Sequence, residues 1–273
     1  MLWTTRIFPV KKMPTIDQNK LVWEKRHHWN KAGDEWSASW GGGELEWAIT
    51  LSSRLHKLLP TGNLLEIAPG FGRWTRFLLP LCESYIGVDL AQKCIDACKE
   101  RFSDVSNASF HVGDGKTLKM VDSSSVDFLF SFDSLVHVDW EVMDSYIEEF
   151  ARVLKPGARA FVHHSNLGHY MKGGVAQIAK TCWRGEDVTA ERVRAKAEGV
   201  GLACVSQEKI AWFVPELVDC ITVFAQPAPG EVMGQTVIKE NYDFPQEGKI
   251  GREIAVTYAG QVFPETPAAT GTP

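Results

Sequence analysis

A glycine turn followed at intervals by carboxylates is the first feature of this sequence that could do chemistry. The turn Pro-Gly-Phe-Gly at 69–72 follows a short apolar run and precedes residues that recur at helical spacing, which predicts a strand, a turn and a helix. Gly70 and Gly72 carry no Cβ, so the backbone there can take positive φ and let a ligand approach the main chain. The first N–H groups of the helix would point toward that ligand.

Two carboxylates stand where an adenosine would need them. Asp89 ends the next predicted strand and follows Glu66 at close to the spacing of about 20 residues that separates a glycine turn from a ribose-binding carboxylate. Asp89 could accept hydrogen bonds from both ribose hydroxyls, and Asp114, beyond the following strand, could accept one from the adenine amine. A glycine turn by itself is equally typical of any tight strand-to-helix crossover, so the combination predicts the adenosine site.

The elements that position these residues alternate between strands and helices. Strands are predicted at about 85–88, 109–112 and 126–131, and the last of these is an almost continuous apolar run, as expected of a parallel strand buried on both faces. A helix at 141–154 ends at Pro156-Gly157, and further strands are predicted at 158–164, 202–210 and 220–226. This alternation predicts an α/β fold.

These motifs, taken in order, resemble those of the class I S-adenosylmethionine-dependent methyltransferases. The resemblance covers roughly 63–225 and includes the FSFDSLVHV strand and the LKPGARAFV segment. It implies S-adenosylmethionine as the cofactor and a Rossmann-like, seven-stranded, mostly parallel sheet whose last strand is antiparallel, with helices on both faces. Pro69 precedes two glycines where many members carry three. Thr75 stands where a nicotinamide-binding turn would have its third glycine, which counts against a dehydrogenase.

The resemblance and the expected sheet edge together predict the cofactor-binding residues. Arg73, directly after the turn, could pair with the methionine carboxylate of the cofactor, and the alternative for it is a surface salt bridge. The predicted set is Trp40, Glu66, Ala68, Gly70, Gly72, Arg73, Asp89, Leu90, Asp114, Gly115, Ser131 and Phe132.

The candidates for a general base follow the fourth and fifth predicted strands. Transfer of a methyl group to a hydroxyl benefits from a base, and His137 and His164 rank equally for that role, with Asp133 orienting a histidine or a substrate hydroxyl. Adjacent residues of a strand point to opposite faces, so at most one of His163 and His164 should face the site.

No metal is expected. Some small-molecule O-methyltransferases place Asp after strand 4 and Asp-Asn after strand 5 around magnesium, and the counterparts here are Asp133 and His163-His164-Ser165-Asn166. Histidine is a poor ligand for magnesium, which prefers carboxylate and water oxygens.

The segment ahead of the predicted core is rich in tryptophan, with Trp23, Trp29, Trp36, Trp40 and Trp47. These rings either pack a helical cap onto the core or line a lid over cofactor and substrate. Trp36 and Trp40 lie next to the glycines 41–43 and are the lid candidates. A sulfonium cation also favours a nearby aromatic face.

The chain divides into three parts on this interpretation. Residues 1–62 form an N-terminal arm and a Trp-rich helical cap, and 63–226 form the methyltransferase core, in which 165–187 is a mobile lid or insert. Residues 227–273 form a C-terminal tail whose end is expected to be disordered.

Composition narrows the choice of partners and compartment. The net charge of −5 and a pI near 5.9 argue against a protein that grips nucleic acid. The six cysteines form no C-x-x-C pair, and no leader or membrane-spanning stretch is evident, which predicts a reduced, cytoplasmic protein without a membrane partner. The sequence leaves open whether the protein forms a homodimer.

The sequence therefore predicts an enzyme that methylates a small molecule, with oxygen of a sugar or a secondary-metabolite scaffold as the favoured acceptor. Natural product biosynthesis is the expected context. Transfer to nitrogen or carbon is one alternative, and a non-catalytic partner subunit that keeps the fold is another.

Overall fold

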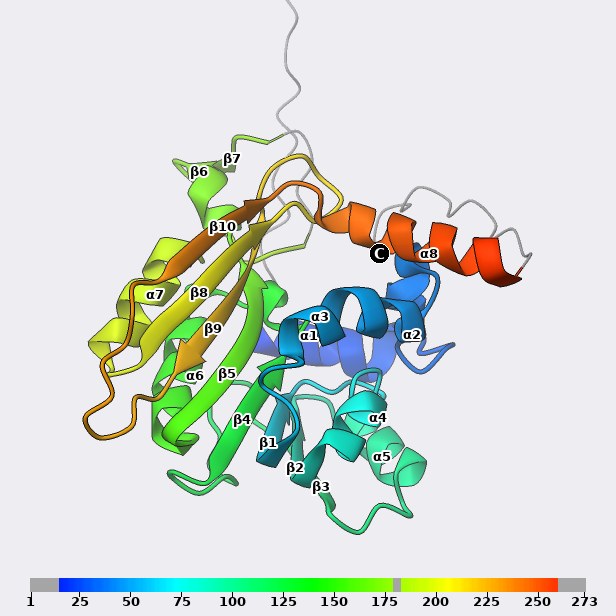
Figure 1. Cartoon of the computed structure of the whole chain (residues 1–273), viewed down its shortest axis with the longest axis horizontal. Coiled ribbons are helices and arrows are strands. Elements are labelled where there is room, and N and C mark those ends of the chain that lie inside the picture. Colours follow the sequence, from blue (N-terminus) through cyan, green and yellow to red (C-terminus); the bar gives the residue numbers. More distant parts are fainter. Residues whose placement is uncertain (1–14, 179–182, 260–273) are drawn as a thin grey trace, which may run out of the picture.

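An eight-stranded mixed sheet runs through the computed structural model, which describes residues 15–178 and 183–259 (Figure 1). Its strands lie in the order β10-β8-β9-β5-β4-β1-β2-β3. Every neighbouring pair is parallel except for β9, which runs antiparallel to both β5 and β8. The strands are β1 Thr61–Ile67, β2 Cys82–Asp89, β3 Ala108–Val112, β4 Val126–Ser131, β5 Leu154–Ser165, β8 Ala203–Ile210, β9 Asp219–Ala225 and β10 Val237–Asn241.

Helices cover both faces of this sheet (Figure 1). Two of these helices are N-capped by side chains. Asp139 accepts a hydrogen bond from the Val142 N–H at the start of α6, and Thr189 accepts one from the Arg192 N–H at the start of α7. The core helices are α4 Thr75–Leu78, η4 Leu79–Leu81, α5 Gln92–Arg101, η5 Leu135–His137, α6 Trp140–Val153 and α7 Ala190–Gly199.

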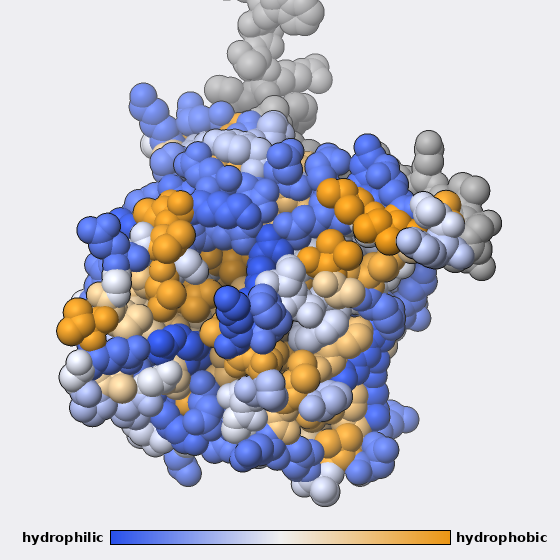
Figure 2. Space-filling view, viewed as in Figure 1, coloured by the Kyte–Doolittle hydropathy of each residue, from blue (hydrophilic) through white to orange (hydrophobic). Residues whose placement is uncertain are grey.

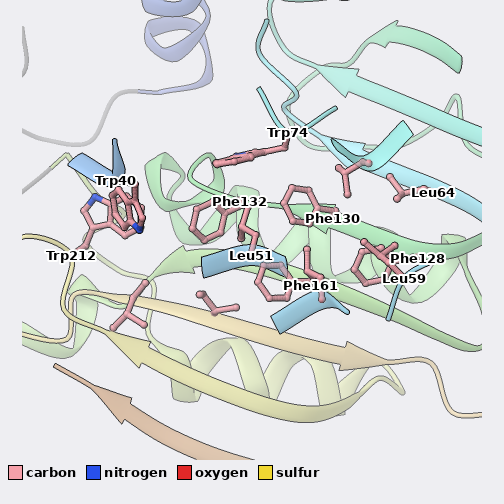
Figure 3. Close-up of a cluster of buried hydrophobic side chains, with 14 of the residues drawn as sticks. Trp40, Leu51, Leu59, Leu64, Trp74, Phe128, Phe130, Phe132, Phe161 and Trp212 are labelled. Carbon is pink, nitrogen blue, oxygen red and sulfur yellow. The ribbon is translucent and has the colours of Figure 1, made fainter. Parts of the chain in front are cut away.

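The N-terminal cap is a run of short helical turns laid against the sheet. Its elements are α1 Ile16–Leu21, η1 Val22–Arg26, η2 Asp34–Trp40, α2 Gly43–Glu46, η3 Trp47–Leu51 and α3 Ser52–Leu55. Leu51 and Leu59 of this part of the chain point into the cluster that holds Phe128 and Phe161 of the sheet (Figure 3). A second apolar cluster on the opposite face packs α6 and α7 against the same strands. The cap is therefore part of the core rather than a loose arm.

The α/β architecture and the antiparallel β9 confirm the predicted fold class, with one strand more than the seven expected. The prediction of a C-terminal tail is wrong for 237–259, because β10 joins the sheet edge and α8 (Phe244–Ala259) packs on the cap. Two glycines on α8 allow this contact. A Cβ on Gly248 would meet Trp40 Cγ at 3.0 Å, and one on Gly251 would meet Ile49 Cγ1 at 3.0 Å. The expected disorder at the end of the chain concerns residues outside the described part.

The segment predicted to be a mobile insert, 165–187, contains ordered elements where it is described. The turn η6 (Leu167–Tyr170) leads into a two-stranded ladder of β6 (Met171–Lys172) and β7 (Val175–Ala176). Gly185 is held in place, since its N–H donates to the Val136 carbonyl at 2.9 Å and its carbonyl accepts from Ser165 Oγ at 2.7 Å. Residues 179–182 lie outside the described part.

Apolar side chains also reach the surface on the last two elements. Val237 and Ile238 of β10 and Ile250 and Ile254 of α8 are at least half exposed, and Figure 2 shows apolar surface over these elements. No helix of the described residues has the length and apolar character needed to cross a membrane.

Candidate active site

The glycine turn lies between β1 and α4 and contains three residues with left-handed backbone. Gly70 and Gly72 have φ of +58° and +84°, and Ala68 has φ of +57°. Ala68 thus takes the conformation that a further glycine would take easily. Its N–H donates to the Val88 carbonyl at 2.7 Å, and its carbonyl accepts from Ser134 Oγ at 3.3 Å. The turn is therefore tied both to β2 and to the segment after β4.

Asp89 at the end of β2 is joined directly to this turn. Its Oδ2 accepts a hydrogen bond from the Gly70 N–H at 3.0 Å, and its Oδ1 accepts from the Ala91 N–H at 2.9 Å. Burial raises the pKa of this carboxyl, and the backbone hydrogen bonds oppose the rise. A carboxylate held beside a glycine turn suits a ribose, so the geometry is compatible with the role predicted for Asp89.

Glu66 has a different environment, because its carboxylate lies under the turn. It accepts hydrogen bonds from the Tyr85 hydroxyl and from Thr75 Oγ1 on α4, and only 1% of the residue is exposed. Burial raises its pKa to about 7, against the opposing effect of these two donors. Its contacts are those of a brace between β1, β2 and α4.

The remaining predicted cofactor residues lie along the same sheet edge. Asp114 is about half exposed and accepts from the backbone N–H groups of Lys116 and Thr117. Gly115 has φ of +82° and lies against Leu90 and against Ile16 of α1. Further inside, Ser131 Oγ donates to the Ile67 carbonyl, and the Phe132 ring lies between the rings of Trp74 and Trp212.

The cap reaches over the glycine turn. The Trp29 ring stacks on Phe71 with the ring centroids 4.6 Å apart, and a Cβ on Gly70 would meet Trp29 at 3.0 Å. The side-chain amide of Asn19 donates to the His137 carbonyl at 3.1 Å. The cap therefore touches both the turn and the segment after β4, where cofactor and acceptor are expected.

Trp40 does not lie over the cofactor edge, so its prediction as a lid residue needs correction. The residue is 1% exposed, its Nε1 donates to Thr50 Oγ1 at 2.9 Å, and its ring packs on Trp212 and on Phe244 of α8 (Figure 3). It is a core residue that joins the cap to α8. Trp36 is 38% exposed, and its lid role stays a prediction.

Arg73 and Asp133 form a buried ion pair, with Arg73 Nη2 2.9 Å from Asp133 Oδ2. The alternative of a surface salt bridge for Arg73 is wrong, since only 7% of the residue is exposed. Asp133 has φ of +59°, and its N–H donates to Nδ1 of His163 at 3.1 Å. The left-handed backbone thus directs Asp133 between Arg73 and β5.

The two adjacent histidines of β5 point to opposite faces, as predicted, and their rings have different partners. His164 is fully buried, with Nδ1 2.8 Å from the Ser165 carbonyl and Nε2 2.7 Å from Thr222 Oγ1. Burial lowers its pKa to about 4. This geometry disagrees with the prediction of His164 as a base. His163 is the histidine on the side of Phe132 and Trp212.

His163 is itself held between two partners. Its Nδ1 accepts from Asp133, so Nε2 carries the proton, and Nε2 lies 3.4 Å from Asp219 Oδ2. Burial opposes ionisation of Asp219, but the ion pair with Arg184, at 2.8 Å, and the contact with His163 lower the pKa of that carboxyl to about 2. His163 therefore belongs to a structural network.

His137, at the end of η5, has one ring nitrogen fixed by a backbone carbonyl. Its Nδ1 is hydrogen-bonded to the carbonyl of Trp183, which makes Nδ1 the protonated nitrogen, and Nε2 has no hydrogen-bond partner among the described residues. Burial and, secondarily, the charge of Arg184 lower its pKa to about 4. The rings of Trp23 and Trp183 lie 6.0 and 5.4 Å from the His137 ring.

The sequence analysis did not identify Trp183, Asp219 and Glu46, which contact His137, His163 and Arg73 respectively, or Arg184, which pairs with Asp219. A sequence pattern does not reveal these contacts, because Arg184 and Asp219 pair over a long sequence separation and Trp183 contacts His137 through its backbone carbonyl. Within the described residues, no group of three or more side chains is arranged to hold a metal ion.

Comparison with known proteins gives a match over the same part of the chain. A family model described as a methyltransferase domain matches residues 64–157, from β1 into β5. The biotin biosynthesis bifunctional protein BioHC of Cellvibrio japonicus is 38% identical over 107 residues, which are 39% of this chain and 20% of that protein. The chain thus spans about a fifth of the length of this curated relative.

Solved structures share the fold at low sequence identity. The [4+2]-cyclase SpnF superposes with a TM-score of 0.56 at 15% identity, over 79% of this chain and 98% of the other. A putative sarcosine dimethylglycine methyltransferase from Galdieria sulphuraria superposes with a TM-score of 0.53 at 15% identity, over 67% and 84%. At this identity the likeness shows the fold alone.

The glycine turn beside Asp89 fits the adenosine of such a cofactor, since both the open backbone and the strand-end carboxylate are in place. Residues 64–157, from β1 into β5, thus match a methyltransferase domain, and the fold is that expected of the class I S-adenosylmethionine-dependent methyltransferases, for which S-adenosylmethionine is the cofactor.

Proposed function

We propose that this protein transfers a methyl group to an oxygen atom of a small molecule, a sugar or a secondary-metabolite scaffold, with His137 as the general base. The observation that carries the proposal is the ring of His137, whose Nδ1 is fixed by the Trp183 carbonyl and whose Nε2 is open. A hydroxyl must lose its proton as it is methylated, whereas a neutral amine can attack without a base. An oriented, unprotonated histidine therefore favours oxygen over nitrogen as the acceptor atom.

The backbone of the turn at Gly70 and Gly72, with the Asp89 carboxylate, would hold S-adenosylmethionine, which supplies an electrophilic methyl group on its sulfonium. Leu90 and Gly115 would border the adenine, and Arg73 would face the methionine end. The proximity of these groups along one sheet edge supports the assignment.

His137 would accept the hydroxyl proton at Nε2. Because its pKa is lowered to about 4, the ring is neutral near pH 7 and its lone pair is available, while the same shift makes it a weaker base than an exposed histidine. Asp133 opposes this lowering of the pKa, so its charge would stabilise the imidazolium that forms.

Displacement at carbon chiefly requires alignment of the acceptor and exclusion of water. Trp23 and Trp183 lie beside the His137 ring, and the ring centroids of Trp36 and Trp23 are 6.3 Å apart. We assign these rings to the cover of the acceptor. A cover of this kind suits a small molecule better than a polymer surface, and the net charge of −5 disfavours nucleic acid.

The five cysteines of the described residues are free thiols, and burial raises the pKa of each one whose pKa departs from its usual value. Such thiols suit a reducing compartment, which supports the proposal of a cytoplasmic enzyme.

Calorimetric titration with S-adenosylhomocysteine, with and without magnesium, tests the cofactor site. Methyl transfer from labelled S-adenosylmethionine to methyl glycosides and phenols then tests the acceptor class, with His137→Gln as the variant. Micromolar binding indifferent to magnesium and methylation of a hydroxyl that depends on His137 would support the proposal. Binding without turnover of any hydroxyl would favour the partner-subunit alternative, and dependence on magnesium would show that a metal takes part.

A further inference from the structure

The carboxylate of Glu46 is buried without a hydrogen-bond partner. Glu46 ends α2 in the cap, none of its surface is exposed, and among the described residues neither Oε1 nor Oε2 has a hydrogen-bond partner. A buried carboxylate without donors is costly for a fold, so a protein that keeps one requires an explanation.

Arg73 connects Glu46 with Asp133, which follows β4. Arg73 Nη1 lies 4.0 Å from Glu46 Oε2, while its Nη2 lies 2.9 Å from Asp133 Oδ2. Ser37 Oγ completes the group, 3.4 Å from Arg73 Nη1. Glu46 and Asp133 thus flank a single guanidinium, and Asp133 stands where the acceptor is expected.

A second polar atom in this cluster also lacks a partner. The indole Nε1 of Trp74 has no hydrogen-bond partner in the described part of the chain, although the residue is only 3% exposed, and the Arg73 guanidinium lies 4.4 Å from the centroid of the Trp74 ring. The Phe132 ring packs against Trp74 with centroids 5.9 Å apart. The surroundings of Arg73 therefore include a hydrogen-bond acceptor without a donor (Glu46), a donor without an acceptor (Trp74 Nε1) and apolar ring faces.

The charges in this cluster select among ligands. An anion such as a phosphate would face two carboxylates, and a simple cation would lie next to the Arg73 guanidinium. A neutral molecule with several hydroxyl groups meets neither repulsion. Its hydroxyls can donate to carboxylate oxygens and accept from an indole N–H, while its C–H faces pack on aromatic rings.

We propose that Glu46 binds a hydroxyl group of a neutral, polyhydroxylated acceptor, and that Glu46 and Trp74 Nε1 form a specificity subsite beside Asp133. This assignment rests on the proposed function and deepens it, since it narrows the acceptor to a sugar-like polyol. Burial raises the pKa of Glu46 to about 7, opposed by Arg73 and Ser37 and reinforced by Asp133 and Asp34. Both below and above that pH, the carboxyl has an oxygen that can accept a hydrogen bond from a hydroxyl group.

Saturation-transfer NMR on the S-adenosylhomocysteine-loaded protein tests this subsite. The probes are the methyl α-glycosides of glucose, mannose, galactose and rhamnose, with choline and inorganic phosphate as charged comparisons. Wild-type protein is expected to bind at least one glycoside and neither ion. Glu46→Gln should weaken glycoside binding by about tenfold or more, as expected for loss of a hydrogen bond to a charged group. Its affinity for S-adenosylhomocysteine should stay within about twofold of wild type.

Glu44→Gln is the matched control, because Glu44 lies on the same short helix but its side chain is 72% exposed. It should bind glycosides like the wild type. Trp74→Phe is the second variant, since it keeps a ring and removes Nε1–H, and it should also weaken glycoside binding. It therefore keeps the test decisive if Glu46→Gln fails to fold.

Three results would overturn the proposal: no glycoside bound by the wild type, equal glycoside binding by Glu46→Gln, or a loss of S-adenosylhomocysteine affinity in that variant. The last would place Glu46 at the methionine end of the cofactor. A wild-type protein that fails to bind S-adenosylhomocysteine would instead defeat the proposed function itself, so the two failures are distinguishable.

Discussion

The carbonyl oxygen of Trp183 accepts a hydrogen bond from Nδ1 of His137, and this contact determines which nitrogen of the ring is free. The residue after Trp183 is Arg184, whose guanidinium forms a buried ion pair with Asp219 on β9. The residue after that, Gly185, has no room for a Cβ, which would lie 2.1 Å from the Val138 carbonyl. The orientation of the proposed base is thus set from outside η5, through the three-residue segment 183–185, which is fixed at each position.

Replacement of the base should separate catalysis from binding. His137→Gln is expected to lower kcat by about 10²–10⁴, the range typical of loss of a general base, and to leave S-adenosylhomocysteine affinity unchanged. Radiometric methyl transfer and calorimetry measure the two quantities. His164→Gln serves as the comparison, because it breaks buried contacts with Ser165 and Thr222 and should lower the melting temperature instead. Full activity of His137→Gln would remove His137 from the mechanism.

The ribose carboxylate can be tested in a shape-conserving way. Asp89→Asn keeps the volume of the side chain but removes the charge and places an amide where two backbone N–H groups now donate. The affinity for S-adenosylhomocysteine should fall by about tenfold or more. The exposed Asp96→Asn on α5 is the control, and calorimetry gives both values. Unchanged affinity in Asp89→Asn would mean that the adenosine lies elsewhere.

Replacement of Arg184, whose ion pair with Asp219 fixes the segment 183–185, should lower both the stability of the fold and kcat. Arg184→Met leaves Asp219 buried and without its ion pair, which typically costs about 3–5 kcal/mol. Chemical denaturation measures this loss, and kcat of the protein that remains folded should also fall, because His137 loses its fixed partner. Arg194→Met on α7 is the control. A stable Arg184→Met protein with normal kcat would contradict the positioning role.

Trp40 and Trp36 should respond differently to truncation. Trp40→Ala removes a ring from the core between Trp212 and α8 and should destabilise the fold by about 3–5 kcal/mol. Trp36→Ala should change stability little, since the residue is 38% exposed, and should raise KM for the acceptor if the ring covers the site. Thermal unfolding and steady-state kinetics distinguish these outcomes, and the reverse pattern would restore Trp40 as the lid residue.

Buried acids give the free energy of unfolding a dependence on pH. Burial raises the pKa of Glu46 and of Glu66 from 4.5 to about 7, so the folded chain holds these protons more tightly than the unfolded chain. Their contribution to stability is complete below about pH 4.5 and is lost as the pH rises through 7. Denaturation of the cofactor-free protein between pH 5 and 8 should show this decline.

The matched variant for this prediction is Glu46→Gln, which should flatten the decline because only Glu66 then contributes. His137 and His164 have the opposite sign. Their pKa values are lowered from 6.5 to about 4, so their contribution is present above pH 6.5 and is lost as the pH falls through 4. An unaltered pH profile in Glu46→Gln would mean that Glu46 titrates normally.

The sequence predicted best those elements whose pattern is set by burial in a parallel sheet. The strand predicted at 126–131 agrees with β4 (Val126–Ser131), and the helix predicted at 141–154 agrees closely with α6 (Trp140–Val153). Continuous apolar runs and a complete helical stripe carry this information locally. The prediction of a tail missed β10 because that strand is short and exposed, and missed α8 because that helix contains Gly248 and Gly251, which local propensity disfavours in a helix.

The candidate site was predicted only where the strand ends determine it. Alternation along β5 established that His163 and His164 face opposite ways, but the partners of each ring come from distant segments, which a sequence pattern does not reveal. The same holds for the tryptophans of the cap, because Trp40 became a core residue only through its contacts with Trp212 and α8.

The packing of α8 on the cap also bears on the order in which the protein can mature on the ribosome. Trp40 and the cap are synthesised early, yet α8 and Trp212, which cover that ring, emerge only after most of the sheet. Arg54 of α3 likewise waits for its carboxylate partners, Glu208 on β8 and Glu247 on α8. During translation the cap therefore remains unfinished while the sheet is being made, so a nascent chain released before α8 would expose an apolar surface that chaperones and proteases recognise.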